Sequence, residues 1–308
     1  MFPIRESMKG GIRVEPYYWD EQIDYLTNSR SMFYNEDYIE FLIKSVWKLS
    51  GPVHIVDFGC GLGYLGLKFL PYLPEGSKYT GIDKGVKLIR KAEENFRGLP
   101  FETEFIISDL YDLDIGEMKY DLAICQAFLM HLPDPKAILE KMIRSVKTEG
   151  KVICIEPHWI SAMANIYVHE MKQSDFMSLG ILQKLYELDA VRTGKDGNIG
   201  VKMPIYMREL GLDNIGCRIN DIVRYINPDH TEEKAMLYNK LCDDGFAAPI
   251  ANEEAFVQNL LSRGLSFEEA QQQLASEKLL HEEYSVNGLQ YNTVYAPTMM
   301  ISYGTKTK

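Results

Sequence analysis

The sequence predicts an α/β fold built on a doubly wound parallel sheet. Between residues 53 and 157, apolar runs of strand length alternate with segments of helical period. Several of these runs end in an acidic residue, and the first, ending at Asp57, is followed by glycines at positions 59, 61 and 63. Strands that alternate with helices in this way form parallel sheets through right-handed crossovers. The acidic residues should therefore lie along one edge of the sheet.

The elements follow each other in a regular order. Strands are predicted at 53–57, 78–84, 101–109, 119–126, 151–157, 212–219 and 293–303. Helices are predicted at 17–26, 35–47, 62–72, 85–96, 135–147 and 199–210. Asn35 is the predicted N-cap of the helix at 35–47. The last strand should pair with the sixth across a long insertion.

Two segments interrupt the alternation of strands and helices. In residues 158–197, Ile160, Met163, Tyr167 and Met171 share one face if the segment is helical. An insertion at the carboxyl end of a central strand faces the site, so we interpret it as an adaptable lid, with a plain pair of packing helices as the alternative. The second insertion has predicted helices at 231–243, 252–263 and 266–285. Ser266 and Glu269 have the spacing of a capping box.

Composition restricts the classes of partner. The chain has 308 residues and a net charge of -11, which argues against nucleic acid or an anionic membrane surface as the main partner. No run approaches the roughly 20 apolar residues of a membrane span. The five cysteines form no Cys-x-x-Cys pair, and residues 1–6 lack the apolar core of a signal peptide. These observations predict a cytoplasmic protein with free thiols and no metal site.

The glycine turn after the first strand fits two cofactors. Gly61, Gly63 and Gly66 have the spacing of a dinucleotide fingerprint, and Asp83 lies 20 residues beyond Gly63. The spacing of Gly59, Gly61 and Gly63 suits S-adenosylmethionine equally well. The glycines alone therefore leave both cofactors open.

Three further features favour S-adenosylmethionine. Asp57 would repel a pyrophosphate and attract the ammonium group of a methionine moiety. Asp109, at the end of the third strand, can accept from an adenine amino group while the N–H of Leu110 faces a ring nitrogen. The strand at 293–303 supplies the antiparallel partner of strand six that a methyltransferase sheet needs.

Six motifs in order resemble those of class I S-adenosylmethionine-dependent methyltransferases, of the small-molecule branch that includes quinone-biosynthesis C-methyltransferases. The motifs are Val-Asp57-Phe-Gly59-Cys-Gly61-Leu-Gly63, Gly-Ile-Asp83-Lys84, Ile-Ser108-Asp109-Leu110, Tyr120-Asp121-Leu-Ala-Ile-Cys-Gln126, His131-Leu-Pro133-Asp-Pro135 and Gly150-Lys-Val-Ile-Cys-Ile-Glu156-Pro. The resemblance implies a Rossmann-like seven-stranded sheet with strand 7 antiparallel and helical cap insertions. It also implies a small-molecule methyl acceptor and leaves a homodimer open. The two helical insertions and the aromatic N-terminus further suggest an enclosed apolar pocket, and hence a hydrophobic or aromatic acceptor.

The resemblance also implies roles for individual residues. The backbone of Gly59, Gly61 and Gly63 would line the methionine moiety. Asp57 would hold the ammonium group and Asp83 the ribose hydroxyls, and Gln126 would face the methionine moiety or the methyl group. The residues at the adenine would be Lys84, Ser108, Asp109 and Leu110. Apart from the resemblance, the aromatic residues Tyr17, Tyr18 and Trp19 could close over the cofactor, with ordinary packing as the alternative.

Methyl transfer from a sulfonium is an in-line displacement, so a base is needed only when the acceptor must lose a proton. His158 and His131 are the catalytic candidates, and Glu156, Tyr17 and Tyr18 are further candidates for the base. His131 alternatively only shapes its loop. Two other functions stay open: an NAD(P)-linked oxidoreductase, and a non-catalytic S-adenosylmethionine-binding protein.

The chain is accordingly predicted to have five parts. They are an N-terminal helical segment covering the site (1–50), the cofactor-binding half of the core (51–157), a helical lid (158–197), the remainder of the core sheet (198–222 and 290–308) and a helical cap (223–289).

Overall fold

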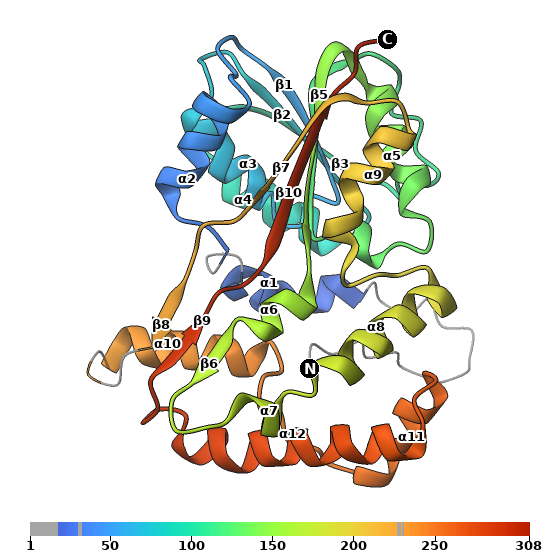
Figure 1. Cartoon of the computed structure of the whole chain (residues 1–308). Coiled ribbons are helices and arrows are strands. Elements are labelled where there is room, and N and C mark those ends of the chain that lie inside the picture. Colours follow the sequence, from blue (N-terminus) through green and yellow to red (C-terminus); the bar gives the residue numbers. More distant parts are fainter. Residues whose placement is uncertain (1–17, 30–32, 227–228, 230) are drawn as a thin grey trace. The chain divides into compact units, whose positions relative to one another are not determined.

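The computed structural model describes residues 18–29, 33–226, 229 and 231–308, which form two compact units (Figure 1). The α/β unit contains residues 18–158, 194–221 and 298–308. The helical unit contains residues 159–193 and 222–297. The segments predicted as a lid and a cap thus belong to one compact unit.

A seven-stranded sheet forms the centre of the α/β unit, with the strand order β3-β2-β1-β4-β5-β10-β7. Its strands are β1 (His54–Phe58), β2 (Lys78–Asp83), β3 (Glu102–Ile107), β4 (Tyr120–Gln126), β5 (Val146–Pro157), β7 (Asp213–Ile219) and β10 (Met299–Thr305). The strands from β3 to β5 pair in parallel, and β10 is antiparallel to both of its neighbours. The predicted doubly wound sheet with an antiparallel seventh strand is confirmed.

Helices cover both faces of this sheet (Figure 1). The helices are α3 (Tyr64–Phe69), α4 (Val86–Phe96), α5 (Pro135–Ser145) and α9 (Met203–Glu209). Ile55 and its neighbours pack against α3 and α4, whereas Val56 and its neighbours pack against α5 and α9. Successive residues of a strand point to opposite faces of the sheet. Because helices cover both faces, strands such as β1 are apolar at consecutive positions. The carboxyl ends of β1 to β5 remain free to form a site.

The N-terminal segment of the α/β unit is helical but less regular than predicted. It contains a 3₁₀ helix (Tyr18–Glu21), α1 (Ile23–Ser29) and α2 (Glu36–Phe41), which continues as a π-helical turn (Leu42–Val46). Asn35 occupies the predicted N-cap position of α2, but its side chain makes no capping hydrogen bond. Its amide nitrogen instead donates to Asp221 Oδ2 over 2.7 Å, so the side chain joins distant parts of the chain.

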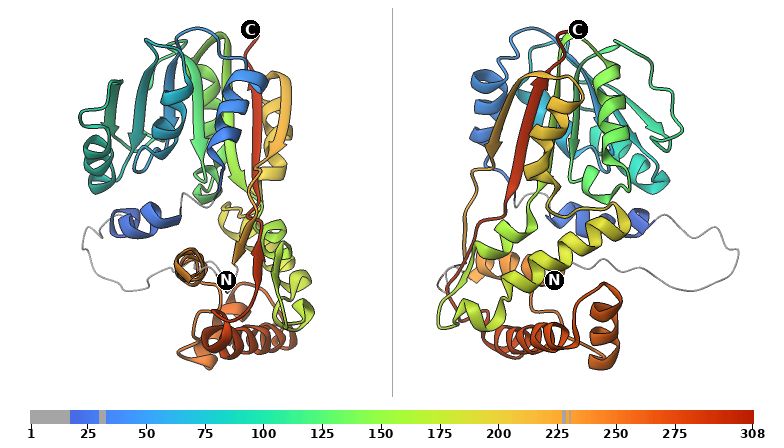
Figure 2. Two further views of the ribbon diagram at one scale, coloured as in Figure 1. Left: turned by 90° about the vertical axis from the view of Figure 1, so that its left-hand side faces the viewer. Right: turned by 45° about the vertical axis from the view of Figure 1, so that its right-hand side comes forward.

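The described residues of the helical unit form six helices and a small antiparallel sheet. Figure 2 shows these elements from two further sides. The helices of the unit are α6 (Trp159–Ala164), α7 (Gln173–Phe176), α8 (Leu179–Thr193), α10 (Thr231–Asp243), α11 (Glu253–Ser262) and α12 (Phe267–Asn287). Its strands are β6 (Ile166–Val168), β8 (Arg224–Ile226) and β9 (Thr293–Tyr295), in the order β6-β9-β8. The capping box of Ser266 and Glu269 is present at the start of α12.

Two predictions fail where this small sheet forms. Tyr167 lies in β6, so it does not share a helical face with Met163. The predicted strand at 293–303 is divided between β9 in the small sheet and β10 in the large one. Pro297, which lies between these two strands, has no backbone N–H to continue a ladder. Alternation of apolar residues could not distinguish one strand from two.

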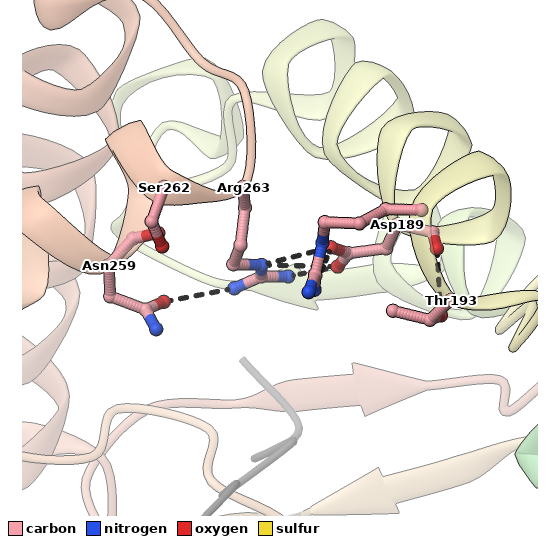
Figure 3. Close-up of polar contacts among 6 residues, drawn as sticks. Asp189, Thr193, Asn259, Ser262 and Arg263 are labelled. Carbon is pink, nitrogen blue, oxygen red and sulfur yellow. Dashed lines mark hydrogen bonds and ion pairs between the residues drawn. The ribbon is translucent and has the colours of Figure 1, made fainter. Parts of the chain in front are cut away.

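A buried ion pair joins α8 to the end of α11 within the helical unit (Figure 3). Arg263 Nη2 lies 2.7 Å from Asp189 Oδ2, and Arg263 Nε lies 3.1 Å from the same oxygen. Arg192 approaches the other carboxylate oxygen, Oδ1, to 3.0 Å. The two segments are therefore cross-linked by side chains and not only by apolar contact. Within the described ranges, no helix is both long and apolar enough to cross a membrane.

Candidate active site

The glycine turn after β1 forms one wall of a pocket at the carboxyl edge of the sheet. Asp57, Gly59, Gly61 and Gln126 line this pocket, which has about 340 Å³ of space outside the protein atoms, part of it open to solvent. A Cβ at Gly61 would meet nothing within 4 Å, so bare backbone faces open space there. A Cβ at Gly59 would lie 2.2 Å from the ring of Phe128. Gly59 is therefore required by packing, and Gly61 leaves room for a ligand.

Asp57 is buried in the wall of this pocket, with 2% of its surface exposed. The hydroxyl of Tyr79 donates to Asp57 Oδ2 over 2.7 Å. Burial raises the pKa of Tyr79 well above its usual value, so the tyrosine keeps its proton and remains a donor. A carboxylate has two oxygens and about four acceptor positions, so the hydrogen bond from Tyr79 does not by itself saturate Asp57.

Asp83, at the end of β2, connects the glycine turn to the start of α4. Its two oxygens accept from the N–H of Gly61 over 3.0 Å and from the N–H of Gly85 over 2.8 Å. Burial raises the pKa of Asp83, and these backbone hydrogen bonds partly offset that effect. The sequence analysis placed Asp83 beside a ligand, and the structure shows that it also fixes the loop around that position.

The adenine-edge candidates lie at the adjacent strand end. The backbone N–H of Ser108 donates to the carbonyl of Asp83 over 3.0 Å, so this segment follows directly beside β2. Asp109 Oδ1 accepts from the N–H of Tyr111 over 3.0 Å, and its Oδ2 lies 3.5 Å from Lys84 Nζ. Leu110 is buried in the core. Asp109 thus forms a local turn and an ion pair besides any contact with a ligand.

Gln126 closes the pocket from the end of β4. Its Nε2 donates to the hydroxyl of Tyr34 over 2.8 Å, and both side chains are buried. Tyr34 comes from the segment before α2, so the N-terminal part of the chain contributes to the order of the site. Sequence analysis did not single out Tyr34, because a tyrosine outside a motif carries no distinguishing signal.

The N-terminal segment is attached to the site by Asp20, which the sequence analysis also missed. Asp20 Oδ1 accepts from the N–H groups of Lys87 and Leu88 at 2.9 and 3.1 Å, and so caps α4 from outside that helix. Tyr18, two residues earlier, is 44% exposed and contacts the ring of Trp19 edge-on at 5.1 Å. Tyr17 lies outside the described residues.

The two histidines occupy different environments. The ring of His131 packs against Trp19, with 5.0 Å between centroids. His158 directly follows β5, and its backbone N–H donates to the carbonyl of Thr298 over 3.1 Å. Burial lowers the pKa of the His158 imidazole, which favours its neutral, proton-accepting form. Catalytic roles for both residues stay predictions.

Glu156 has a structural role that the sequence did not reveal. It is completely buried, and its Oε1 accepts from the N–H groups of Phe128 and Leu129 at 3.1 and 2.9 Å. Its Oε2 accepts from Met130 N–H over 3.3 Å. Burial raises the pKa of Glu156 to about 7, against the lowering effect of these hydrogen bonds. Since Phe128 packs on Gly59, Glu156 holds the loop that shapes the glycine turn.

Comparison with known proteins identifies the domain that carries this site. Residues 49–197 match a family model described as a methyltransferase domain. This matched segment, just under half of the chain, is therefore similar to methyltransferase domains of known proteins. Among the residues with described positions, no group of three or more His, Cys, Asp or Glu side chains could hold a metal ion.

Named relatives match this chain over a limited length. An uncharacterized methyltransferase of Schizosaccharomyces pombe is 30% identical over 153 residues, covering 47% of this chain and 54% of the relative. A demethylmenaquinone methyltransferase of Desulfitobacterium hafniense is 31% identical over 104 residues, covering 33% of this chain and 41% of the relative. The chain thus spans about half the length, or less, of these two relatives.

A solved structure supports the same fold for the methyltransferase. The phosphoethanolamine N-methyltransferase 2 of Haemonchus contortus, in complex with phosphomonomethylethanolamine and S-adenosylhomocysteine, superposes with a TM-score of 0.51. The match covers 94% of this chain and 59% of that chain at 12% identity. At this identity the similarity concerns the fold.

Proposed function

We propose that the protein transfers a methyl group from S-adenosylmethionine to a small, largely apolar acceptor. The observation that carries the proposal is Asp57, a buried carboxylate in a pocket walled by the open backbone of Gly61. A buried carboxylate in this position disfavours a phosphate and favours the ammonium group of a methionine moiety. This argues for S-adenosylmethionine over NAD in the same glycine turn.

We assign residues at the carboxyl edge of the sheet to successive parts of this cofactor. We assign Asp57 to the ammonium group and Gln126 to the methionine end. Asp83, which already orients Gly61, has remaining acceptor capacity for the ribose hydroxyls. Ser108, Asp109 and Leu110 are assigned to the adenine edge at the next strand end. When bound, the cofactor supplies an electrophilic methyl group, and the chain's contribution is to orient donor and acceptor and to exclude water.

Two observations support a small molecule as acceptor. The net charge of -11 disfavours a polyanionic substrate. The matched relative from Desulfitobacterium hafniense is named for a quinone-type acceptor, demethylmenaquinone. Cytoplasmic location and a homodimer remain predictions from the sequence.

Isothermal titration calorimetry tests the cofactor assignment directly. S-adenosylhomocysteine should bind with a dissociation constant in the micromolar range, corresponding to about -8 kcal/mol, whereas NAD should give no heat of binding. Tight binding of NAD alone would overturn the proposal. Transfer of a radioactive methyl group from S-adenosylmethionine to an apolar acceptor then separates an enzyme from a non-catalytic binding protein.

A further inference from the structure

The turn after β3 is held differently from the other strand ends of the parallel sheet. Strands β1, β2, β4 and β5 each lead into a helix, whereas residues 108–119, between β3 and β4, belong to no helix or strand. A helix supplies its own backbone hydrogen bonds and so fixes the turn where it begins. The turn that carries Asp109 and Leu110 therefore depends on other contacts to hold its shape and position.

Asp109 organises the first part of this turn. Its backbone carbonyl accepts from the N–H groups of Asp112 and Leu113 over 3.1 and 3.0 Å, so this carbonyl points into the turn. In a planar trans peptide group the N–H points opposite to the carbonyl, and the N–H of Leu110 therefore points out of the turn. These hydrogen bonds lie within the turn, so they define its shape but do not attach it to the rest of the α/β unit.

Lys141, in the middle of α5, attaches the turn to that helix. Its Nζ donates to three backbone carbonyls, those of Leu110, Tyr111 and Leu113, at 2.7, 2.5 and 3.4 Å. A lysine ammonium has three donors, so the three carbonyls can use all of them. Because a charged donor makes stronger hydrogen bonds than a neutral one, Lys141 restricts the movement of this backbone.

Two further contacts join the turn to α5. The hydroxyl of Tyr111 donates over 3.1 Å to the carbonyl of Asp134, the N-cap residue of α5. The side chain of Leu110 is buried in the same apolar cluster as Met142 of that helix. These contacts involve side chains of the turn, whereas Lys141 binds its backbone. Lys141 therefore holds the frame in which the N–H of Leu110 is presented.

Adenine has two neighbouring groups that match this turn, an amino group that donates and a ring nitrogen that accepts. The carboxylate of Asp109 would accept from the amino group, and the N–H of Leu110 would donate to the ring nitrogen. Hypoxanthine has an oxygen in place of the amino group and a proton on the ring nitrogen, so it reverses both roles. A site built on such polar pairs rejects the reversed base only while both of its groups stay in place.

We propose that Lys141 is a positioning residue for adenine recognition, which keeps Asp109 and the N–H of Leu110 where they select adenine over hypoxanthine. The inference rests on the proposed binding of S-adenosylmethionine and extends it, because it assigns the choice of base to a side chain of α5. Lys141 acts through the backbone of the turn and needs no contact with the cofactor. All of these residues belong to the α/β unit.

Calorimetry on the full chain with two nucleosides tests the choice of base. The nucleosides are S-adenosylhomocysteine and S-inosylhomocysteine, which differ only in carrying adenine or hypoxanthine. The unaltered protein should bind the adenine compound at least about 30-fold more tightly, because hypoxanthine places like groups opposite both polar groups of the turn. Equal affinities would show that the turn does not read the base and would overturn the inference.

Lys141→Met tests the positioning role. Methionine keeps an unbranched apolar side chain but removes the three donors. The affinity for S-adenosylhomocysteine should fall at least about tenfold, whereas the affinity for S-inosylhomocysteine should fall less than about threefold. Lys136→Met is the matched control on the same helix. Lys136 pairs with Glu209 over 2.6 Å, and its replacement should leave both affinities unchanged.

The ratio of the two affinities separates positioning from general support of the fold. Continued binding of S-inosylhomocysteine shows that the Lys141→Met protein is folded. An equal loss for both nucleosides in this variant, or no change for either, would refute the inference. If the unaltered protein bound neither nucleoside, the proposed function would fail together with this inference. Binding of S-adenosylhomocysteine without a preference for adenine would refute the inference alone.

Discussion

Three buried carboxylates, two in the α/β unit and one in the helical unit, are held by different kinds of donor. In the α/β unit, Asp83 and Glu156 accept mainly from backbone N–H groups of loops at the carboxyl edge of the sheet. In the helical unit, the carboxylate of Asp189 meets the guanidinium groups of Arg263 and Arg192. Backbone donors fix the path of a loop, whereas side-chain donors join helices whose own backbone is already satisfied.

The two kinds of donor predict different effects when the carboxylate or its partner is removed. Removing Asp83 or Glu156 should change the shape of a loop in the proposed cofactor site. Removing an ion pair from the helical unit should weaken the contact between two segments and leave the loops of the α/β unit unchanged. Three substitutions test this comparison.

Asp83→Ala should have the largest effect. It removes the proposed acceptor for the ribose hydroxyls and leaves the N–H groups of Gly61 and Gly85 without their carboxylate. Two lost charge-assisted hydrogen bonds correspond to about 4 kcal/mol, or roughly a 1000-fold weaker affinity for S-adenosylhomocysteine, measured by calorimetry.

Asp109→Ala provides the comparison at the next strand end. Its side chain is 39% exposed and already contacts Lys84, so the loss of affinity should stay below about tenfold. If Asp83→Ala bound the nucleoside within threefold of the unaltered protein, the ribose assignment would be wrong.

The sequence predicted the large sheet because its elements are local and regular. Strands β1, β2, β4 and β5 are each followed by a helix, and only β3 leads directly to the next strand, so most of the topology follows from the order of the elements. The acids at strand ends were found for the same reason, since Asp57 and Asp83 lie in contiguous motifs. The division of residues 293–303 between two sheets depends on long-range pairing, which a local pattern does not contain.

The residues that hold the site together were harder to predict. Asp20 caps a helix 67 residues away in the chain, and Glu156 binds a loop 26 to 28 residues before it. Neither has a characteristic spacing, because a hydrogen bond to a backbone N–H places no demand on the identity of the donor residue. Such contacts become visible only once the fold has brought the partners together.

Glu156→Gln should change the pH dependence of stability. The folded pKa of Glu156 is about 7, raised from 4.5, so its contribution to stability is complete below pH 4.5 and is lost as the pH rises through 7. Relative to the variant, the free energy of unfolding of the unaltered protein should fall by about 3 kcal/mol across this range. Urea denaturation at a series of pH values measures this difference.

Tryptophan fluorescence can confine that measurement to the α/β unit. In a Trp159→Phe background, Trp19 and Trp47 are the remaining tryptophans, and both belong to the α/β unit. A difference between protein and variant that stays constant from pH 4.5 to 8 would show that Glu156 does not titrate in this range. If the free energy of unfolding of the unaltered protein rose with pH relative to that of the variant, the sign would be opposite to the expected one. That result would contradict the burial argument.

Arg263→Met should have the smallest of the three effects and should act on the helical unit alone. Arg263 is largely buried against Asp189, whereas the side chain of Arg192 is 45% exposed. Loss of the buried partner should destabilise the unit by about 2 kcal/mol, less than for a fully buried pair because Arg192 still neutralises Asp189. Arg192→Met is the matched control and should lower the free energy of unfolding by less than about 1 kcal/mol.

Denaturation followed by the fluorescence of Trp159, with Trp19 and Trp47 replaced by Phe, measures the stability of both variants. If the two variants were equally stable, exposure would not govern the strength of these ion pairs, and the contrast between the units would rest on the α/β unit alone.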